Sequence, residues 1–211
     1  MNIKKITNLA LKFTINRMIE TFGLSVSIIG ALLLIALISY SPNDPNFIFP
    51  ENTEIHNVLG FNGSYISDLF FQSIGIISYL ISITLTVTGV NIFRHKDLFL
   101  IIENIFFSIL YCILGTIFFN FFHQHSFELY SNGNGGFIGQ HLNQIFFSDL
   151  INLQKAVSYY FLIILIIVLF LTSCNFNPKK FWFFLKEIVN YFNKDKVLDK
   201  SYTNKSEIIS E

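Results

Sequence analysis

The sequence contains one carboxylate inside a long apolar run, Glu103, which comes shortly after the start of that run at Leu98. An acid within a membrane is a functional candidate, because burying its charge costs about 3 kcal/mol or more. Glu103 lies only about 8 Å along a helix from the start of the run, and no acidic or basic side chain occurs in any other apolar run. We therefore predict that Glu103 reaches the membrane interface or is neutral against Asn104, with proton relay or transport as the alternative.

Histidines and cysteines could bind a metal ion, but their spacing gives such a site little support. His123 and His125 form an H-x-H pair and His141 follows them, while no carboxylate or cysteine nearby has a matching ligand spacing. We therefore predict interfacial histidines and no bound metal. Cys112 lies inside an apolar run and Cys174 at the end of another, so both are predicted to pack as small hydrophobic residues rather than form a disulfide.

The residues needed to bind nucleotide phosphates are missing from the sequence. No G-x-x-x-x-G-K-[ST] loop occurs anywhere, so phosphates cannot be held in the P-loop manner. The glycine cluster at residues 131–139 contains no lysine, and it predicts a flexible loop that leads into a short amphipathic segment in which Gly139 allows tight packing. The sequence thus predicts no catalytic residue and no cofactor.

The apolar runs that contain or flank these residues are long enough to be membrane spans. Of the 211 residues, 52% are hydrophobic and 26 are phenylalanine, which is more apolar surface than one soluble core could hide. Four runs could cross a bilayer: residues 22–39, 69–93, 98–122 and 156–174. The first is interpreted as an uncleaved span, because it lacks a small-x-small cleavage site. The predicted fold class is all-α: a polytopic membrane protein with a four-helix transmembrane bundle and two extracytoplasmic loops.

Cationic side chains predict the orientation of these spans. Lys and Arg precede the first run, fill the turn between the second and third, and follow the fourth, whereas the connections 40–68 and 123–154 contain neither. Because Lys and Arg are retained on the cytoplasmic side, both termini are predicted to be cytoplasmic. The expected divisions are a basic N-terminus at 1–20, a membrane domain at 21–178, an interfacial segment at 179–192 and a polar linker start at 193–211.

Small and polar residues within the runs predict where the helices touch. In lipid the hydrophobic effect contributes little between helices, so close approach and side-chain hydrogen bonds must hold them together. The second run places five such residues three or four apart, on one helix face: Gly75, Ser78, Ser82, Thr86 and Gly89. Similar sets occur in the third run (Asn104, Ser108, Cys112 and Gly115) and in the first (Gly23, Ser27 and Ala31). We predict helix-packing seams, with a conduction pathway as the alternative.

Residues 179–192 combine aromatic side chains on one side of a predicted helix with flanking lysines. This pattern predicts a helix in the inner membrane interface, with its rings toward lipid and its cations toward anionic headgroups. A basic DNA-binding patch is the alternative, which the acidic Glu187 weakens. The final stretch, 193–211, is polar and is predicted to be disordered, as the start of a linker would be.

Three loop sequences beside the expected spans carry a family resemblance. Residues 39–47 read SYSPNDPNF after the first span, residues 57–68 read NVLGFNGSYISD before the second, and residues 135–142 read GGFIGQHL before the fourth. In this order they resemble the N-terminal four-helix region of the FtsK/SpoIIIE family of bacterial DNA translocases, over residues 20–172. The motif residues are Ser41, Pro42, Asp44, Pro45, Gly60, Gly63, Asp68, Gly135, Gly136 and Gly139.

The resemblance implies a membrane anchor and scaffold at the division septum, in the bacterial inner membrane, for a hexameric ATP-driven motor that moves chromosomal DNA. It also implies homo-oligomers, contacts with other division proteins, and DNA contact only through the motor domain, which these residues lack. The chain is then either a fragment of a longer protein or a free-standing membrane domain.

Two other functions compete with this one on the residues alone. A small multi-pass transporter or channel subunit would need paired repeats, broken helices or several polar groups at mid-depth, and Glu103 alone points that way. An outward-facing enzyme would need a nucleophile with its base, or two well-spaced carboxylates, and neither long connection offers such a set.

Overall fold

The computed structural model describes residues 3–45, 54–124, 132–142, 151, 154–179, 182 and 186. Every regular element within these ranges is a helix, and four helical stretches are long and apolar enough to cross a membrane: Thr7–Ile38, Gly60–His95, Phe99–Phe122 and Lys155–Ser173. These findings confirm the predicted all-α membrane class and its four spans.

The chain divides into two compact units, Met1–Asn175 and Phe176–Glu211, and all four stretches belong to the first. The interfacial segment predicted at 179–192 lies outside the described residues apart from Lys179, Trp182 and Lys186. The linker start predicted at 193–211 lies outside them entirely.

Helix α1 runs from Ile3 to Ile38, so it begins well before the span predicted at 22–39. Residues 3–20 contain neither proline nor glycine, and lysine, leucine and isoleucine are frequent there, so nothing breaks the helix between the basic N-terminus and the span. The basic segment predicted at 1–20 is thus largely the first part of one continuous helix. α1 ends before Pro42 and Pro45, neither of which could continue it.

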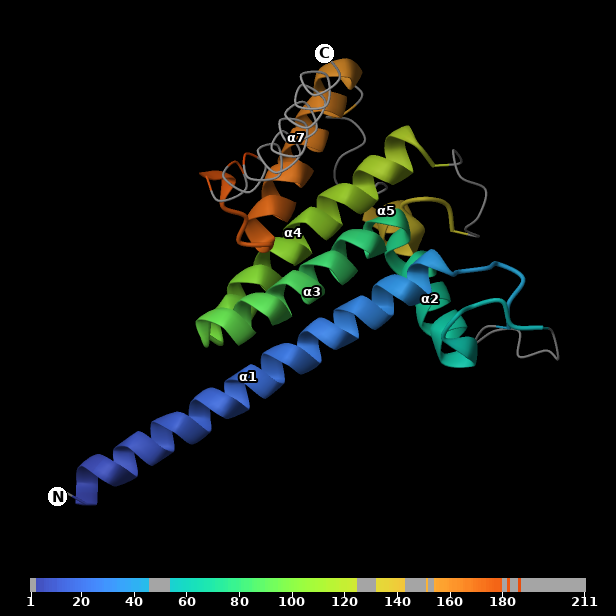
Figure 1. Cartoon of the computed structure of the whole chain (residues 1–211). Coiled ribbons are helices and arrows are strands. Elements are labelled where there is room, and N and C mark those ends of the chain that lie inside the picture. The colour runs from blue at the N-terminus through green and yellow to red at the C-terminus, as the bar shows by residue number, and fades with distance from the viewer. Residues whose placement is uncertain are drawn as a thin grey trace, which may run out of the picture. The chain divides into compact units, whose positions relative to one another are not determined.

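The second span is a pair of helices rather than the single helix predicted at 69–93. α2 runs from Gly60 to Ile74, a 3-10 turn covers Gly75–Ile77, and α3 runs from Ser78 to His95. Gly75 has φ 64° and ψ −144°, a backbone conformation that residues with a Cβ rarely adopt. α2 therefore leaves the line of α3 at this glycine (Figure 1).

The remaining helices are α4 (Phe99–Phe122), the short α5 (Gly136–Leu142) and α7 (Lys155–Ser173). Just before α4, Asp97 Oδ1 accepts the N–H of Phe99, the first residue of the helix, at 2.9 Å. α1 packs along α3, α3 along α4, and α4 along α7, while α5 covers α2 and part of α4 (Figure 1). The long helices are therefore joined pairwise in the order α1, α3, α4, α7.

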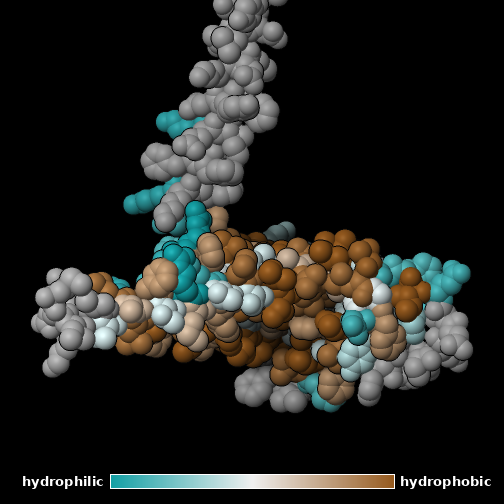
Figure 2. All heavy atoms as spheres, turned by 60° about the horizontal axis from the view of Figure 1, so that its bottom comes forward, coloured by the Kyte–Doolittle hydropathy of each residue, from teal (hydrophilic) through white to brown (hydrophobic). Residues whose placement is uncertain are grey.

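Two apolar clusters fill the contacts between these helices. The larger is formed by Ile77, Tyr111, Ile117, Phe118, Ile151, Leu162 and Ile166, and the smaller by Leu33, Leu37 and Phe71. Many other large hydrophobic side chains stay exposed, and Figure 2 shows a broad hydrophobic face between two groups of hydrophilic residues. Exposed apolar surface of this extent fits a chain whose helices are surrounded by lipid.

Candidate functional site

The three motif segments meet at one end of the helices, where α1 ends and α3 begins. We call this region the loop end, and define it as residues 39–45, 54–68 and 132–142. It contains the first part of α2 and the short helix α5. Its segments are held by side chains that bind the backbone of a different segment.

Asp44 joins the first loop motif to the second. Its side chain is buried, with the residue 5% exposed. Oδ1 accepts the backbone N–H of His56 at 2.9 Å and lies 3.0 Å from His56 Nδ1, while Oδ2 accepts the backbone N–H of Asn57 at 2.8 Å. Because both carboxylate oxygens accept backbone N–H groups of the next segment, Asp44 fixes the start of the second motif onto the end of the first.

Asn57 continues this connection down to α1. Its Nδ2 donates to the carbonyl of Ala36 at 2.9 Å, within the last turn of α1, and its Oδ1 accepts the Leu59 N–H at 3.1 Å. Gly63 lies against the same amide, where an added Cβ would overlap Asn57 Oδ1. Gly63 is therefore small because the Asn57 side chain passes directly over it.

A second layer lies beneath, between α1, α2 and α3. Asp68, within α2, accepts a hydrogen bond at Oδ1 from the Tyr40 hydroxyl at 3.1 Å. The Tyr79 hydroxyl donates to the carbonyl of Leu37 at 3.2 Å. The ring of Phe71 packs between the two tyrosines, at centroid distances of 4.9 Å from Tyr40 and 5.4 Å from Tyr79. Both polar contacts fix the end of α1 against the broken span.

The other residues of the first two motifs shape their turns. The Pro45 carbonyl accepts a hydrogen bond from the Ser64 hydroxyl at 2.8 Å. Ser41 Oγ accepts one from the Asn43 N–H at 3.4 Å. Pro42 is exposed in the turn after α1. Gly60 has φ 66° and starts α2, where its N–H donates to the Asn57 carbonyl at 2.8 Å.

The glycine segment is packed rather than free, which differs from the flexible loop predicted for residues 131–139. The Asn134 carbonyl accepts the Ile76 N–H at 3.0 Å, and a Cβ on Gly75 would overlap that carbonyl. A Cβ on Gly136 would lie 2.6 Å from Ser73 backbone atoms. Backbone therefore meets backbone at the break in the second span, and this contact requires glycine on both sides.

Gly135 and Gly139 fit the same segment onto α4. An added Cβ on Gly135 would lie 2.8 Å from the Asn120 backbone nitrogen, and one on Gly139 would lie 2.5 Å from the Thr116 carbonyl. The third motif thus docks on the end of α4 as well as on the break at Gly75, through the tight packing that the sequence predicts for Gly139.

Away from the loop end, α1 and α3 meet through glycines. An added Cβ on Gly89 would lie 2.5 Å from the Gly23 carbonyl and would overlap the backbone of Ser27. One on Gly30 would lie 2.5 Å from the Thr86 backbone nitrogen. The set predicted for the first span (Gly23, Ser27 and Ala31) does not include Gly30, because a spacing of four residues leads from Ser27 to Ala31. The sequence does place a glycine four residues before Ser27 and another three residues after it, and that pattern could have identified Gly30.

The five residues predicted to form one packing seam in the second span do not all contact the same helix. Gly75 lies at the break and meets Asn134, while Thr86 and Gly89 meet α1. Ser78 and Ser82 are buried, but their hydroxyls donate within their own helical turns, to the carbonyls of Gly75 and Tyr79.

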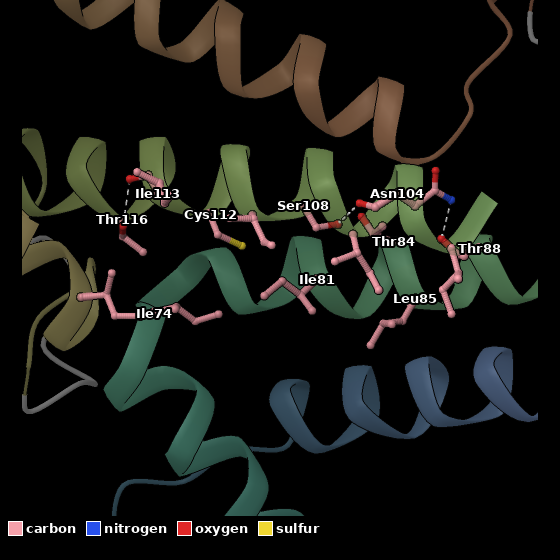
Figure 3. A pocket seen from close by; sticks show the side chains of 14 residues that line it. Ile74, Ile81, Thr84, Leu85, Thr88, Asn104, Ser108, Cys112, Ile113 and Thr116 are labelled. Atoms are coloured by element: carbon pink, nitrogen blue, oxygen red, sulfur yellow. Dashed lines mark hydrogen bonds between the residues drawn. The ribbon is translucent and has the colours of Figure 1, made fainter. Parts of the chain in front are cut away.

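The predicted residues of α4 face α3. Asn104 Nδ2 donates to Thr88 Oγ1 at 2.8 Å, and Gly115 lies against the Ile77 side chain. Ser108 donates to the Asn104 carbonyl in its own helix, and Cys112 lines a groove of about 360 Å³ between α3 and α4 (Figure 3). The groove wall is almost entirely apolar, so this space offers few groups to a polar solute.

The ionisable candidates are scattered. Glu103 is exposed on α4. His123 Nε2 lies 3.3 Å from the Tyr159 hydroxyl, His141 stacks on Phe137, and His125 lies outside the described residues. Both cysteines are free thiols. Within the described ranges, no three His, Cys, Asp or Glu side chains gather where they could hold a metal ion.

Comparison with known proteins identifies the family. A family model described as the 4TM region of DNA translocase FtsK/SpoIIIE matches residues 16–182. A DNA translocase FtsK of Rickettsia prowazekii is 27% identical over 79% of this chain, one of Azospirillum brasilense is 30% identical over 40%, and one of Caulobacter vibrioides is 37% identical over 34%. No solved structure matches the chain.

The match covers only part of each relative. It spans 22% of the length of the Rickettsia prowazekii protein, 14% of that of Azospirillum brasilense and 9% of that of Caulobacter vibrioides. The family model, in contrast, covers most of this chain, including the first membrane helix from residue 16 onward, the other three membrane helices in full and the three loop motifs. The chain therefore belongs to the family of membrane domains described as the 4TM region of the DNA translocases FtsK and SpoIIIE.

Proposed function

We propose that this chain anchors a DNA translocase in the bacterial inner membrane and holds it at the division septum, as a scaffold for cell division and chromosome partition. The relatives are named as DNA translocases, and the four membrane helices provide the means of anchoring. The ATP-driven motor and the contact with DNA belong, in this proposal, to a domain that these 211 residues do not contain.

The observation that carries the septal part is the interlocked loop end. Asp44, Asn57 and the glycine contacts hold three segments as one body. Recognition residues are often found on loops that a rigid scaffold positions. Val58 is 74% exposed, and Phe61 and Phe137 are also exposed on this body. These apolar side chains are the proposed contacts for division proteins, while the buried motif residues position them.

The proposed topology places the loop end outside the cytoplasm. The opposite end carries Arg17 and Lys96: Lys96 pairs with Glu20 at 2.8 Å, and Arg17 pairs with the same carboxylate. Alkaline phosphatase fused after Asn52 is expected to be active, and the same fusion after His95 inactive, because the enzyme works only outside the cytoplasm. Activity after His95 but not after Asn52 would invert the topology.

A transporter or channel would need a broken helix, and the second span supplies one at Gly75. The backbone of Asn134 and Gly136 fills that break, however, and the groove between α3 and α4 is apolar. Among the described residues, neither place presents an acid or a base. The anchor is therefore the better supported function, and a homo-oligomer, hexameric by family resemblance, is the form we propose for it.

The test follows a fluorescent fusion of the chain in a bacterium whose division machinery is close to the native one. The intact chain is expected to concentrate at the septum, because specific contacts are needed to depart from an even outline. Val58→Ser with Phe61→Ser is expected to reduce that enrichment while membrane insertion persists. Phe99→Ser is the matched control, since Phe99 is 77% exposed at the opposite end of the helices. An even outline for the intact chain would remove the septal function.

A further inference from the structure

The end of α7 is fastened to its neighbours by several polar side chains, whereas near its start Tyr159 alone makes such a contact among the bonds described above, with His123 at 3.3 Å. Most of α7 contacts α4 through apolar residues, of which Leu162 and Ile166 are buried. At its last turn the contacts become hydrogen bonds, involving Ser173, Cys174 and Asn175. This is the point from which the polypeptide continues into residues 176–211.

Thr84 of α3 is the centre of the first group of bonds. Its hydroxyl lies 3.0 Å from the Tyr111 hydroxyl of α4, 3.2 Å from the Ser173 hydroxyl and 3.8 Å from the Cys174 sulfur. Thr84 is only 3% exposed, so water does not replace these partners. Because a hydroxyl offers one donor and two acceptor positions, all three contacts can be satisfied at once. One side chain therefore links three helices.

Asn104 of α4 is the centre of the second group. Its Nδ2 donates to Thr88 Oγ1 at 2.8 Å, a bond drawn in Figure 3, and its Oδ1 accepts from Asn175 Nδ2 at 2.8 Å. Asn91 of α3 adds a bond from its Nδ2 to the Cys174 carbonyl at 3.3 Å. Asn104 is 1% exposed and uses both ends of its amide. The Cys174 carbonyl and the Asn175 side chain, directly after α7, are thus both held.

These bonds differ from the apolar contacts of α7 in how they resist a pull along the helix axis. Apolar side chains in lipid lose little when a helix slides, because the lipid is as apolar as the neighbouring helix. Hydrogen bonds are directional and weaken steeply when the donor and acceptor separate. Resistance to axial displacement is therefore concentrated at Thr84, Asn91 and Asn104.

We propose that Thr84, Asn91, Asn104, Ser173 and Asn175 form a clamp, the α7 clamp, that transfers force exerted on the chain beyond Asn175 to α3 and α4. The inference rests on the proposed function for the origin of that force, a translocase attached on the C-terminal side. The clamp makes the membrane domain resist extraction from this end as three helices rather than one.

The first test pulls the intact chain out of a supported bilayer by its C-terminal end, in single-molecule force spectroscopy. The force at which α7 is extracted is expected to fall in Thr84→Val, which keeps the side-chain shape and removes the hydroxyl. Thr86→Val is the matched control, because the Thr86 hydroxyl donates only to the Ser82 carbonyl of its own helix at 2.8 Å. Pulling from the N-terminal end should give the same first force peak in all three proteins. Equal C-terminal extraction forces would overturn the clamp.

The second test uses Cys174 as a native probe, in a Cys112→Ser background. Removing one interhelical hydrogen bond in a membrane protein changes an opening equilibrium by about threefold to tenfold. Thr84→Val and Asn104→Leu each remove at least one bond to the end of α7, so each should raise the rate of Cys174 alkylation by about threefold or more. Thr86→Val should leave the rate unchanged. Alkylation at the parent rate in both clamp variants would mean that the bonds do not hold the end of α7. Neither measurement involves a septum or a motor, so the clamp and the septal function can fail separately.

Discussion

The loop end and the seam between α1 and α3 hold the chain together by different means. At the loop end, side chains bind the backbone of distant segments, as Asp44 binds the N–H groups of His56 and Asn57. In the seam, glycines let two backbones approach, as Gly89 does against Ser27. The loop end thus depends on donors and acceptors in addition to its own glycine contacts, such as Gly63 against Asn57, whereas the seam depends on volume. Substitutions that change hydrogen bonding at constant size should therefore harm the loop end, and those that add volume should harm the seam.

The largest effect is expected for Gly89→Leu. The new side chain would begin at a Cβ that overlaps the backbone of Ser27, so α1 must move away from α3. Overpacking of this kind costs about 3 kcal/mol or more, and the midpoint of unfolding in an SDS titration of the purified chain should fall accordingly. Val90→Leu is the control, because Val90 is exposed beside it. Equal midpoints for the two variants would show that the seam does not depend on volume.

A smaller effect is expected for Asp44→Asn, which keeps the size of the side chain. One carboxylate oxygen becomes an amide NH₂ group, so a donor must face the backbone N–H of either His56 or Asn57. Leaving a buried donor unsatisfied costs about 1–3 kcal/mol, to be measured in the same titration.

Glu54→Gln is the matched control for Asp44→Asn, since Glu54 also lies at the loop end but is exposed. If the amide variant were as stable as the control, Asp44 would not join the two motifs, and the rigid body that we propose for septal contacts would lose its main support.

The sequence predicts the four spans because each depends on local composition alone. Length and apolarity decide whether a segment can cross a bilayer, and both can be counted along the chain. The extent of α1 is also a local property, since residues 3–20 contain neither proline nor glycine. The predicted span starts at residue 22 because hydropathy defines it, whereas a helix continues wherever nothing breaks it.

The break at Gly75 could not be predicted in the same way. Its cause lies near residue 134, where a backbone carbonyl accepts the Ile76 N–H and occupies the space of a Cβ on Gly75. Similarly, nothing around Asp44 indicates that its partners are His56 and Asn57. Both the break at Gly75 and the contacts of Asp44 depend on residues far apart in the sequence. A single sequence shows which residues are present, but it does not show which of them pair.

The smallest effect is expected for Ser82→Ala, in the middle of α3. The Ser82 hydroxyl is buried, yet it donates at 2.8 Å to the Tyr79 carbonyl of its own helix. That carbonyl is also part of the backbone hydrogen bonding of α3, so the substitution leaves no acceptor without a hydrogen bond. Serine bonds of this type do not favour a helix, and the expected change is about 0.5 kcal/mol or less.

This variant sharpens the comparison because Asp44→Asn and Ser82→Ala each alter one buried polar group, and both can be followed in the same SDS titration. The Asp44 bonds cross between segments, whereas the Ser82 bond stays within one turn, so only the first should matter for how segments are joined. A loss for Ser82→Ala as large as that for Asp44→Asn would mean that the Ser82 hydroxyl supports the contact between α1 and α3. The seam would then depend on polar atoms as well as on volume, and the distinction between the two regions would fail.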